Sequence, residues 1–475
     1  MRTAILVLLF AIYILLIISV VFVERKNPTE ALLWVLVLIF LPYVGVILYL
    51  AFGSTISIRL TSAIRTRRLY NRYDTNKLKK TLVQRRKKKD CPLSKVDERV
   101  IRFNENYNEC PLSYYEDADI FTSGKAHYES LFSDIKNAKK SIHIEFYTIH
   151  NDQIGQAFAK ALAEKAQEGV EVLVMLDFIA NLSTPKAMFA PLVEAGGKVK
   201  RLKPYLTHFR CHRKIVTIDS KIGYIGGMNI GKQYANMAEK KNPWRDTQIR
   251  LTGQCVQMLE FYYMTDWFCA QKRREMAEAE HIADRILESP ETLGARPCQF
   301  VLGGVETTNE PVKMCYLAMI RSAKKSIRIQ SPYFVPDKSI LDALKTAAAS
   351  GVSIEIMIPG IKASFFLDPV TTYYAGELLP YGAKIYKYHG YVHAKTLVID
   401  EDLCSIGSVN MDMRSLMVDD EICGVFYENK LVRSYIDILE EDKTHCDAYT
   451  KEMHDKRSRK ERISESFFLL FAPLL

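Results

Sequence analysis

The chain lacks the sequence signatures of a disulfide framework and of a metal site. Its ten cysteines are scattered and include no CxxC pair. That distribution fits reduced thiols in a cytoplasmic core better than disulfides. Its ten histidines show no HExxH and no other metal-ligand spacing. We therefore predict that the chemistry of this protein uses no metal and no other cofactor.

Acidic residues are nearly absent from one segment, and the rest of the chain lacks a strong excess of either charge. The formal net charge is +10, and residues 59–89 hold thirteen Lys or Arg against one acid, Asp74. The remainder is therefore close to neutral. Proteins that bind nucleic acid usually carry a broad basic surface, so this distribution argues against a nuclease and predicts no nucleic-acid partner.

The most informative feature that is present is a repeated octet. Residues 212–219 read HRKIVTID, and residues 393–400 read HAKTLVID. Each copy is followed by a glycine and by an asparagine seventeen positions after the histidine. One such octet arises by chance in roughly one chain in twenty, and two with matching Gly and Asn are far rarer. Two copies of one reactive group indicate a single active site with two halves.

The apolar end of each octet is typical of a buried β-strand. That interpretation alone does not explain why a histidine and a lysine stand two positions apart in both copies. Residues i and i+2 of a strand point to the same face. An imidazole and an ammonium that share one surface suit an anionic phosphate.

The repeat extends well beyond the octets. Residues 138–144 are echoed by 323–329, and residues 169–175 by 351–357, with alanine-rich helical stretches between them in each half. Alternating strands and helices indicate α/β units. The separation of 181 residues (393 less 212) to 185 residues (323 less 138) indicates duplicated domains rather than short repeats. We predict an α/β fold of two lobes that face each other across a pseudo-twofold axis.

Two histidines at one seam between lobes allow phosphoryl transfer in two steps. One neutral imidazole attacks phosphorus to form a phosphohistidine, while the other, protonated, donates to the departing alkoxide, and the roles then reverse. Imidazole can do both because its unperturbed pKa lies near neutrality. The lysines would hold the non-bridging oxygens, and the asparagines would add neutral donors. The candidate residues are His212, Lys214, Asn229, His393, Lys395 and Asn410.

Each histidine is expected to have a carboxylate partner that fixes its tautomer. For His393 the candidate is Glu421, twenty-eight residues further on. The first half has Lys240 at the same count, so the candidate partner of His212 moves to Asp246, which implies a short insertion. The alternative for both acids is an ordinary solvated carboxylate.

These motifs resemble the phospholipase D superfamily, which is marked by a paired HxKxxxxD motif with a downstream glycine and asparagine. Within it, the flanking segments are similar to the bacterial cardiolipin synthase family. The likeness covers nearly the whole chain and includes the N-terminal apolar pair and residues 244–247 (WRDT), 331–336 (SPYFVP), 408–415 (SVNMDMRS) and 472–475 (APLL).

The resemblance implies two phospholipase D-like α/β/α sandwich lobes. It also implies transfer of a phosphatidyl group from one phosphatidylglycerol to another, which yields cardiolipin and glycerol through a phosphohistidine. By the superfamily's usual order, His212 is the nucleophile and His393 the acid. The octet aspartates, Asp219 and Asp400, are counted among the catalytic residues. Gly227 departs from the superfamily pattern, in which serine is common at this place.

Two apolar runs, residues 3–23 and 31–52, stand near the start of the chain. Each has about the twenty residues that a bilayer core requires. A cleaved signal peptide is the alternative for the first run, but its positive start is short and no small-x-small cleavage site follows. We therefore predict a hairpin of two transmembrane helices, in which Pro42 and Gly45 kink the second helix without preventing insertion.

Basic residues and apolar tails suggest further contact with a membrane. Positive charge next to a membrane span marks the cytoplasmic side, so residues 59–89 place the lobes on the cytoplasmic side of a bacterial cell membrane. This stretch could hold anionic phospholipid headgroups, and a nucleic-acid patch or a solvated helix is the alternative. The apolar part of the tail at 451–475, residues 467–471, is too short to span. It lies in the interface as an anchor or packs on the catalytic domain as a cap.

The expected order of segments is two transmembrane helices (1–55), a basic juxtamembrane segment (56–109), the first lobe (110–270), a linker (271–311), the second lobe (312–450) and the tail (451–475). Aromatic residues are expected to exclude water from the seam: Tyr333, Phe334, Phe365, Phe366, Tyr373 and Tyr374. Two other functions stay open, a membrane-bound phosphodiesterase that uses water as acceptor on phospholipid or nucleic acid, and a non-catalytic scaffold. The intact His, Lys and Asn of both halves argue against the scaffold.

Overall fold

The computed structural model of the 475-residue chain describes residues 10–11, 13–23, 28–50, 95–202, 210–237, 243–270, 294–304, 309–362, 364–470 and 472. Contacts divide the chain into a small N-terminal unit, residues 1–68 with 204–209, and a larger unit of residues 69–203 and 210–475. The expected basic segment at 59–89 lies outside the described residues, as do residues 271–293 of the expected linker.

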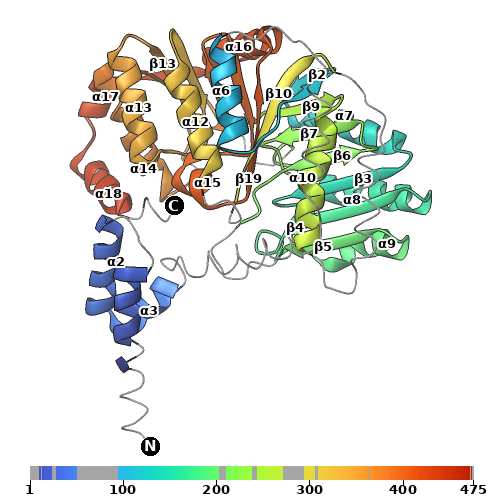
Figure 1. Ribbon diagram of the computed structural model, residues 1–475, viewed down its shortest axis with the longest axis horizontal. Coiled ribbons are helices and arrows are strands. Elements are labelled where there is room, and N and C mark those ends of the chain that lie inside the picture. The colour runs from blue at the N-terminus through green and yellow to red at the C-terminus, as the bar shows by residue number, and fades with distance from the viewer. Residues whose placement is uncertain are drawn as a thin grey trace, which may run out of the picture. The chain divides into compact units, whose positions relative to one another are not determined.

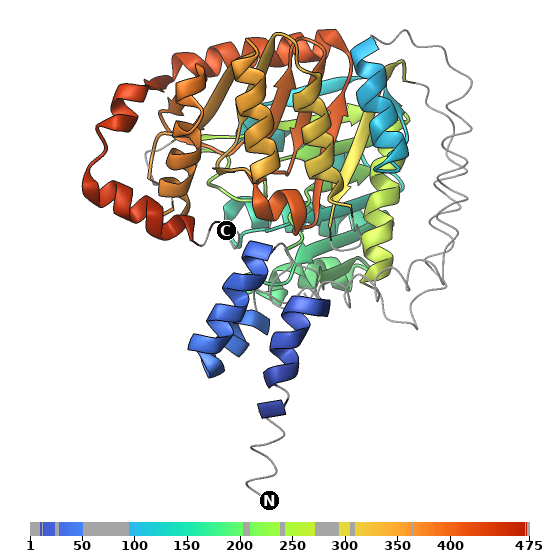
Figure 2. The same cartoon turned by 60° about the vertical axis from the view of Figure 1, so that its left-hand side comes forward.

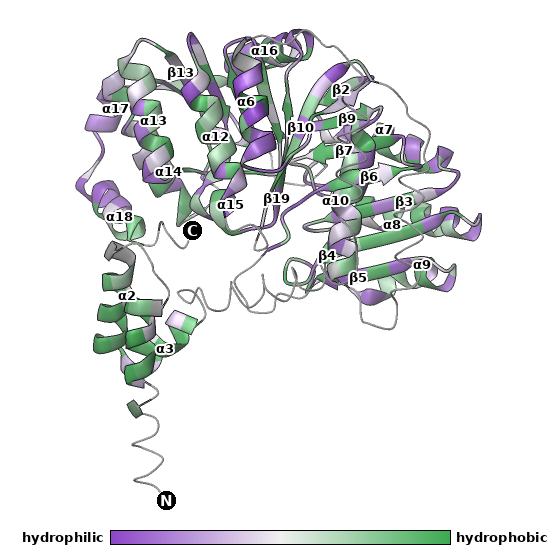
Figure 3. Ribbon diagram, viewed as in Figure 1, coloured by the Kyte–Doolittle hydropathy of each residue, from purple (hydrophilic) through white to green (hydrophobic). Residues whose placement is uncertain are grey.

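The described part of the N-terminal unit is helical and largely apolar (Figure 3). It includes the π-helix η1 (Ser19–Val23), α2 (Pro28–Phe40) and α3 (Pro42–Leu48). The second apolar run therefore forms two helices, which are separated at Leu41 by a φ of −126° and a ψ of 64°. Pro42 explains the break, because the residue before a proline is driven out of the helical region. In the described part of the chain, no helix is both long enough and apolar enough to cross a membrane.

The larger unit is built on two mixed sheets (Figure 1). The first has seven strands in the order β2-β9-β7-β6-β3-β4-β5. Their bounds are β2 (Ala118–Phe121), β3 (Ser141–Phe146), β4 (Glu171–Asp177), β5 (Lys198–Leu202), β6 (Ile215–Ile218), β7 (Ile222–Gly226) and β9 (Gln248–Thr252).

The second sheet has nine strands in the order β1-β10-β19-β17-β16-β11-β13-β14-β20. Their bounds are β1 (Ser113–Tyr115), β10 (Arg296–Gly303), β11 (Ser326–Gln330), β13 (Ser353–Pro359), β14 (Lys384–Tyr388), β16 (Thr396–Ile399), β17 (Leu403–Gly407), β19 (Glu421–Phe426) and β20 (Cys446–Tyr449). Two small ribbons accompany the sheets, formed by β8 (Trp244–Arg245) with β15 (Tyr391–Val392) and by β12 (Phe334–Val335) with β18 (Met411–Asp412).

The two sheets repeat one topology. In each, a central strand, β3 or β11, runs parallel to the next two strands along the sheet. On its other side it pairs antiparallel with the strand that ends an octet, β6 or β16. Antiparallel strands β7 and β9, or β17 and β19, then continue the sheet. The predicted mixed α/β fold with two duplicated lobes is confirmed, and both octet strands are fully buried as expected.

Helices cover the sheets and join the lobes (Figures 1 and 2). The helices α7 (Gly124–Asn137), α8 (Gln153–Gln167) and α9 (Ala190–Glu194) share a core with the first sheet. The helices α6 (Lys95–Asn106), α12 (Pro311–Ser322) and α13 (Lys338–Ala349) share a core with the second. A third cluster unites α10 (Cys255–Cys269) and α16 (Asn429–Thr444) with strands of both sheets. The lobes are thus joined through apolar packing.

The lobe boundaries differ from the expected ones. β1 and α6 precede the first lobe in the sequence but belong to the second, because β1 pairs with β10 and α6 buries Val100 and Ile101 in the second core. β10 lies inside the expected linker, yet it pairs with β19 as β2 pairs with β9. The second repeat therefore begins at β10, earlier than the sequence echoes at 323–329 indicated.

The C-terminal tail packs on the second lobe as a cap. It contains α17 (Lys451–Asp455) and α18 (Arg459–Leu469), and α18 begins with a capping box between Ser458 and Glu461. Phe468, a residue of α18, is buried in a cluster with Val335 and Val370. The remaining elements are short: η3 (Lys186–Phe189), α14 (Leu367–Gly376), η5 (Leu379–Tyr381) and α15 (Met413–Met417).

Candidate active site

The octets place their histidine and lysine just before a central strand of each lobe. His212 and Lys214 precede β6, and His393 and Lys395 precede β16. Strand alternation therefore does not arrange these pairs, contrary to expectation, because the four residues lie outside the strands. Both lysines are buried, and each ammonium donates to the carbonyl of its own histidine, with 2.5 Å between Lys214 Nζ and His212 O.

Short backbone bridges carry each octet to the opposite lobe. Cys211 bridges in parallel to Asp420, and the N–H of His212 donates to the carbonyl of Asp420 at 2.9 Å. In the other copy, β15 pairs in parallel with β8, and the N–H of His393 donates to the carbonyl of Arg245 at 2.6 Å. His212 therefore lies opposite Glu421, the residue after Asp420. His393 lies opposite Asp246, the residue after Arg245.

The two predicted carboxylates contact histidines, but each contacts the histidine of the other lobe. Glu421 Oε1 lies 2.8 Å from Nδ1 of His212, and Asp246 Oδ2 lies 2.6 Å from Nδ1 of His393. Both acids are fully buried, so neither is an ordinary solvated carboxylate. The predicted pairing within each lobe, Glu421 with His393 and Asp246 with His212, is wrong, because the backbone bridges set each acid against the opposite lobe.

Asp246 and Glu421 occupy equivalent places in the two lobes. In each sheet, the glycine that ends the strand after the octet pairs with the residue two positions beyond the acid. The two acids are 175 residues apart (421 less 246), whereas the octets are 181 apart (393 less 212). The first lobe therefore holds six extra residues before Asp246, in agreement with the short insertion expected there.

The residues beside the two acids differ. Ser408 donates its hydroxyl to the carboxylate of Glu421, and its carbonyl lies 3.1 Å from Nδ1 of His212. The equivalent residue in the first lobe is Gly227, where an added Cβ atom would lie 2.1 Å from Oδ1 of Asp246. The departure from serine at this place therefore follows from the position of the Asp246 carboxylate.

The two predicted asparagines are buried but differ in their hydrogen bonds. Asn229 donates from Nδ2 to the hydroxyl of Tyr234 at 2.9 Å and accepts from the N–H of Thr148 at 3.4 Å. Oδ1 of Asn410 is buried and has no hydrogen-bond partner in the described part of the chain. A buried polar group without a partner is costly. A ligand that donates a hydrogen bond to Oδ1 of Asn410 would therefore gain more binding free energy than one that displaces the hydrogen bonds of Asn229.

The aspartates that end the octets lie at the far ends of β6 and β16 from the histidines. Asp219 and Asp400 each accept three backbone N–H bonds of 2.6 to 3.0 Å at the start of β3 and of β11. Each has a positive φ, 53° and 52°. A four-residue strand of roughly 3.3 Å per residue separates them from the lysines. This placement contradicts their assignment to the catalytic residues and gives them a role in joining strands.

Burial keeps both histidines neutral when no ligand is bound. Desolvation and the charge of Lys395 lower the pKa of His393 to about 3. Desolvation and Lys214 hold the pKa of His212 well below its usual value. Desolvation also lowers the pKa of Lys214 to about 8 and that of Lys395 to about 7. A bound phosphate would raise all four values, since opposite charge favours the protonated form.

The two carboxylates are shifted in opposite directions. Burial raises the pKa of Glu421 to about 7, although Lys214 and the Ser408 hydroxyl act against it. Burial also acts to raise the pKa of Asp246, but His393 and Lys395 outweigh it, and the pKa lies below its usual value. Near neutral pH, Asp246 is therefore ionised, while Glu421 lies close to its titration point.

Three aromatic rings surround His393. The ring centroids of Trp244, Tyr391 and Tyr234 lie 4.9, 5.8 and 6.3 Å from that of the imidazole. Trp244 Nε1 is buried and has no hydrogen-bond partner among the described residues. Sequence reasoning missed these rings. A usable signal existed, because Trp244 and Tyr391 each stand two positions before a predicted site residue, Asp246 or His393, and i and i+2 share a side in extended chain.

The aromatic residues predicted to exclude water lie elsewhere, with one exception. Tyr333 accepts a hydrogen bond of 2.9 Å from the hydroxyl of Tyr391 and so supports the ring that stacks on His393. The others are placed in the core of the second lobe, on α14 or at the surface: Phe334, Phe365, Phe366, Tyr373 and Tyr374.

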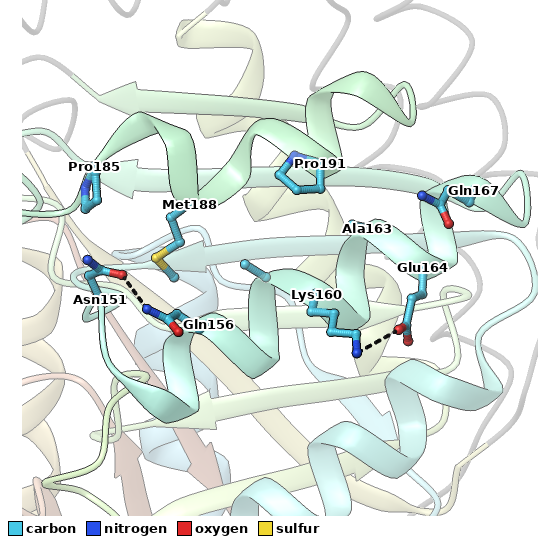
Figure 4. A pocket seen from close by; sticks show the side chains of 10 residues that line it. Asn151, Gln156, Lys160, Ala163, Glu164, Gln167, Pro185, Met188 and Pro191 are labelled. Carbon is cyan, nitrogen blue, oxygen red and sulfur yellow. Dashed lines mark hydrogen bonds and ion pairs between the residues drawn. The ribbon is translucent and has the colours of Figure 1, made fainter.

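A hollow of 550 Å³ lies on the first lobe, beside α8 and the segment from η3 to α9 (Figure 4). Its polar side chains bond to one another: Gln156 donates to Asn151 at 3.2 Å, and Lys160 lies 3.9 Å from Glu164. No predicted site residue lines it. Across the described residues, no group of three or more His, Cys, Asp or Glu side chains is placed to hold a metal ion.

The comparisons with known proteins agree with the paired motifs. Residues 131–242 and 316–443 match the family model described as cardiolipin synthase, PLD-like domain. The chain belongs to the phospholipase D-like cardiolipin synthase family. Residues 11–54 also match a model described as phospholipase D–nuclease N-terminal. The matched family segments contain both histidines and Glu421 but stop before Asp246, which the sequence proposed and whose contact with His393 the geometry shows.

Relatives in the cardiolipin synthase family match over nearly their full length. The cardiolipin synthase of Oceanobacillus iheyensis is 33% identical over 495 residues, with 98% of each chain covered. The major cardiolipin synthase of Bacillus subtilis is 34% identical over 486 residues, again with 98% of each covered. The crystal structure of phosphatidylserine synthase from Haemophilus influenzae Rd KW20 has a TM-score of 0.62 and 14% identity, covering 79% of this chain and 97% of that one. That likeness concerns the fold.

Proposed function

We propose that this protein is a cardiolipin synthase, which transfers the phosphatidyl group of one phosphatidylglycerol to a second and releases glycerol. The observation that carries the proposal is the pair of histidines, each held through Nδ1 by a buried carboxylate of the other lobe. Because both Nδ1 atoms are engaged, both Nε2 atoms are left to react with a phosphate between them. The full-length likeness to cardiolipin synthases supports the choice of substrate.

In the first half-reaction, Nε2 of His212 attacks the phosphorus of one phosphatidylglycerol. The P–N bond forms as the bond from phosphorus to the headgroup glycerol oxygen breaks. His393, protonated, gives its proton to that oxygen, and free glycerol leaves. The phosphatidyl group stays on His212 as a phosphohistidine.

In the second half-reaction, the headgroup hydroxyl of another phosphatidylglycerol is the nucleophile. His393, now neutral, takes the hydroxyl proton as the oxygen attacks phosphorus. The P–O bond forms as the P–N bond to His212 breaks, which yields cardiolipin. His212 is again neutral and His393 protonated, the state that a bound phosphate favours over the neutral state of the empty site.

The lysines balance the charge of the phosphate. Lys214 and Lys395 are buried beside the histidines, and their ammonium groups lose charge readily without an anion. A bound phosphate restores the protonated form and holds its non-bridging oxygens against two positive groups. Asn410 adds a buried amide oxygen, Oδ1, that no described protein atom engages and that can accept a hydrogen bond from the headgroup hydroxyl of a lipid.

The carboxylates favour His212 as the nucleophile and His393 as the acid. Ionised Asp246 stabilises the imidazolium form of His393, which a general acid needs. Glu421 titrates near neutrality and so stabilises a charge on His212 less strongly. The rings of Trp244, Tyr391 and Tyr234 keep water from the proton-accepting side of the site, so a lipid hydroxyl reaches the phosphohistidine first.

The N-terminal unit is the proposed membrane attachment. Residues 11–54 match the N-terminal family model, and α2 and α3 are apolar. A hairpin of the two apolar runs, 3–23 and 31–52, would anchor the chain as a multi-pass protein of a bacterial cell membrane. The basic residues 59–89 would then hold the catalytic lobes on the cytoplasmic side, next to anionic phospholipid.

The test gives purified full-length protein in detergent only phosphatidylglycerol and follows lipid products and free glycerol. Cardiolipin and glycerol are expected in equal amounts, with both lost in His212→Ala and in His393→Ala. Leu182→Ala, at an exposed position of the first lobe, is the matched control and should keep full activity. Phosphatidic acid in place of cardiolipin would mean that water is the acceptor and would contradict the proposal.

A further inference from the structure

One face of α18 is apolar and exposed. Ile463, Phe467 and Leu470 stand at i, i+4 and i+7, so they share one stripe of the helix. They are 68%, 54% and 68% exposed. Phe468, on the other side, is buried in the cluster beneath the helix. Figure 3 shows α18 changing from hydrophilic at its start to hydrophobic at its end. The packing of α18 on the second lobe therefore leaves this apolar stripe exposed to solvent.

Two exposed rings from another segment pack on α18 through Phe468. Phe365 and Phe366, just before α14, are 76% and 55% exposed. Both pack on Phe468, with 5.2 Å between ring centroids. We call Phe365, Phe366, Ile463, Phe467 and Leu470 the aromatic patch. Single exposed apolar residues are ordinary, but a group of five large ones from two segments marks an interaction surface.

A basic cavity of 690 Å³ opens beside the aromatic patch, and Phe365 is part of its wall. Four basic side chains line it: Lys362, Lys387, Lys456 and Arg457. Lys387 lies 4.0 Å above the ring of Tyr449 and forms no salt bridge within the described residues. Burial lowers the pKa of Lys387, and an anion in the cavity would offset that cost.

The acidic side chains of the cavity are already engaged by the protein. Glu465 pairs with Arg457 at 2.5 Å, and Glu461 accepts the N–H of Ser458 in the capping box. Asp368 accepts the N–H of Ser364 at 2.9 Å. Lys456 pairs with Glu452, which leaves Lys362 and Lys387 to meet a negatively charged ligand.

We propose that the aromatic patch and the basic cavity together form a docking surface for a bilayer that contains anionic phospholipid. The apolar side chains enter the interfacial region, and one anionic headgroup occupies the cavity beside Lys387. Apolar side chains flanked by Lys and Arg are the chemistry of interfacial helices. A second copy of the chain fits less well, because a symmetric contact would bring two basic cavities together. The proposal deepens the proposed function, in which the substrates are lipids of the bilayer.

The experiment uses full-length protein in phosphatidylcholine vesicles, with or without phosphatidylglycerol, whose acyl chains carry bromine to quench tryptophan fluorescence. Ile463→Trp places a reporter in the aromatic patch. Leu182→Trp, at a position that is 64% exposed on the first lobe, is the matched control. The fluorescence of the unsubstituted protein is subtracted from that of each variant, and the quenching of the two added tryptophans is then compared. Quenching is expected at residue 463 in vesicles with phosphatidylglycerol, and not at residue 182.

A second variant tests the cavity. Lys387→Gln should reduce the ratio of docked to undocked protein about fivefold in vesicles with phosphatidylglycerol, the effect of one cation near an anionic surface. In phosphatidylcholine alone it should change nothing. Equal quenching at residues 463 and 182, or none at either, would overturn the proposal. So would burial of residue 463 by dimer formation without lipid.

The quenching needs no turnover, so the two proposals can fail separately. A protein that docks through residue 463 but makes no cardiolipin would contradict the proposed function alone. A protein that makes cardiolipin without quenching at residue 463 would contradict the docking surface alone.

Discussion

The carboxylate of Asp246, in the first lobe, lies 2.6 Å from Nδ1 of His393, in the second. The N–H of His393 donates to the carbonyl of Arg245, so one backbone bridge holds both members of the pair. Glu421 and His212 repeat the relationship in the opposite direction. Neither lobe contains a complete pair of histidine and acid, and the site therefore exists only when the two lobes are packed together.

The crossed pairing predicts which histidine responds to each acid. Asp246→Asn should change the tautomer of His393 and leave that of His212 unchanged, and Glu421→Gln should do the reverse. In other nucleophilic sites such a change lowers kcat on the order of 10³–10⁴-fold. Nitrogen NMR of labelled histidines measures the tautomers directly. If Asp246→Asn altered His212 and spared His393, the pairing described here would be incorrect.

Gly227 is predicted to be essential for the position of Asp246. Gly227→Ser should lower activity nearly as much as Asp246→Asn, because the added Cβ would lie 2.1 Å from Oδ1 of Asp246. Ser408→Ala, at the equivalent position, removes one hydrogen bond to Glu421 and should cost roughly tenfold or less. The check is kcat for both variants alongside thermal unfolding. Full activity of a folded Gly227→Ser would contradict the prediction.

The pKa values predict a bell-shaped dependence of kcat/KM on pH. Below about 7, Glu421 becomes protonated and no longer accepts from Nδ1 of His212, so activity falls as pH falls. Above about 7 to 8, Lys395 and Lys214 lose charge in the free enzyme, so phosphate binding weakens as pH rises. The maximum should therefore lie near neutrality, with apparent values that belong to the coupled group. A flat profile on both sides of neutrality would contradict this account.

Much of the site follows from the sequence, because the repeat carries it. The octets and the matching asparagines can be recognised from spacing alone, whereas the two acids follow at unequal counts and Asp246 requires a short insertion. The crossing of the acids cannot, since it depends on the bridges of Cys211 to Asp420 and of β15 to β8. Such pairings join residues far apart in the chain and leave no local pattern.

Trp244 is predicted to decide between lipid and water as acceptor. Trp244→Ala should open the wall beside His393 and raise the ratio of phosphatidic acid to cardiolipin, because water then reaches the phosphohistidine. Trp244→Phe keeps an aromatic ring and should preserve transfer. The product ratio on phosphatidylglycerol is the measurement. An unchanged ratio in a folded Trp244→Ala would assign water exclusion to other residues.

Asp219 is predicted to act on stability and not on the chemical step. Asp219→Asn weakens charge-assisted bonds to three backbone N–H groups, with an expected loss of about 1–3 kcal/mol in the free energy of unfolding. The folded fraction should keep its kcat. Denaturant unfolding and active-site titration separate the two effects. A large fall in kcat without loss of stability would return Asp219 to the catalytic residues.

Asp219 and Asp400 also show where a motif can mislead. Each octet contains residues with two different roles: the histidine and lysine belong to the site, and the aspartate joins strands. A short strand lies between the lysine and the aspartate. Sequence spacing records that they occur together, but the hydrogen bonds to the start of β3 and of β11 place the aspartates outside the site. The rings around His393 were missed for the opposite reason, since they come from both lobes and belong to no repeated motif.

The most direct test of the two-histidine mechanism is to locate the covalent intermediate. His393→Ala is mixed with phosphatidylglycerol that carries a labelled phosphate, quenched with base to preserve phosphohistidine, and digested for mass spectrometry. The mechanism predicts label on His212 and no cardiolipin, because attack can occur slowly without the acid while the second hydroxyl is not activated. Label that appears on His393 in His212→Ala, with none on His212 in His393→Ala, would contradict it.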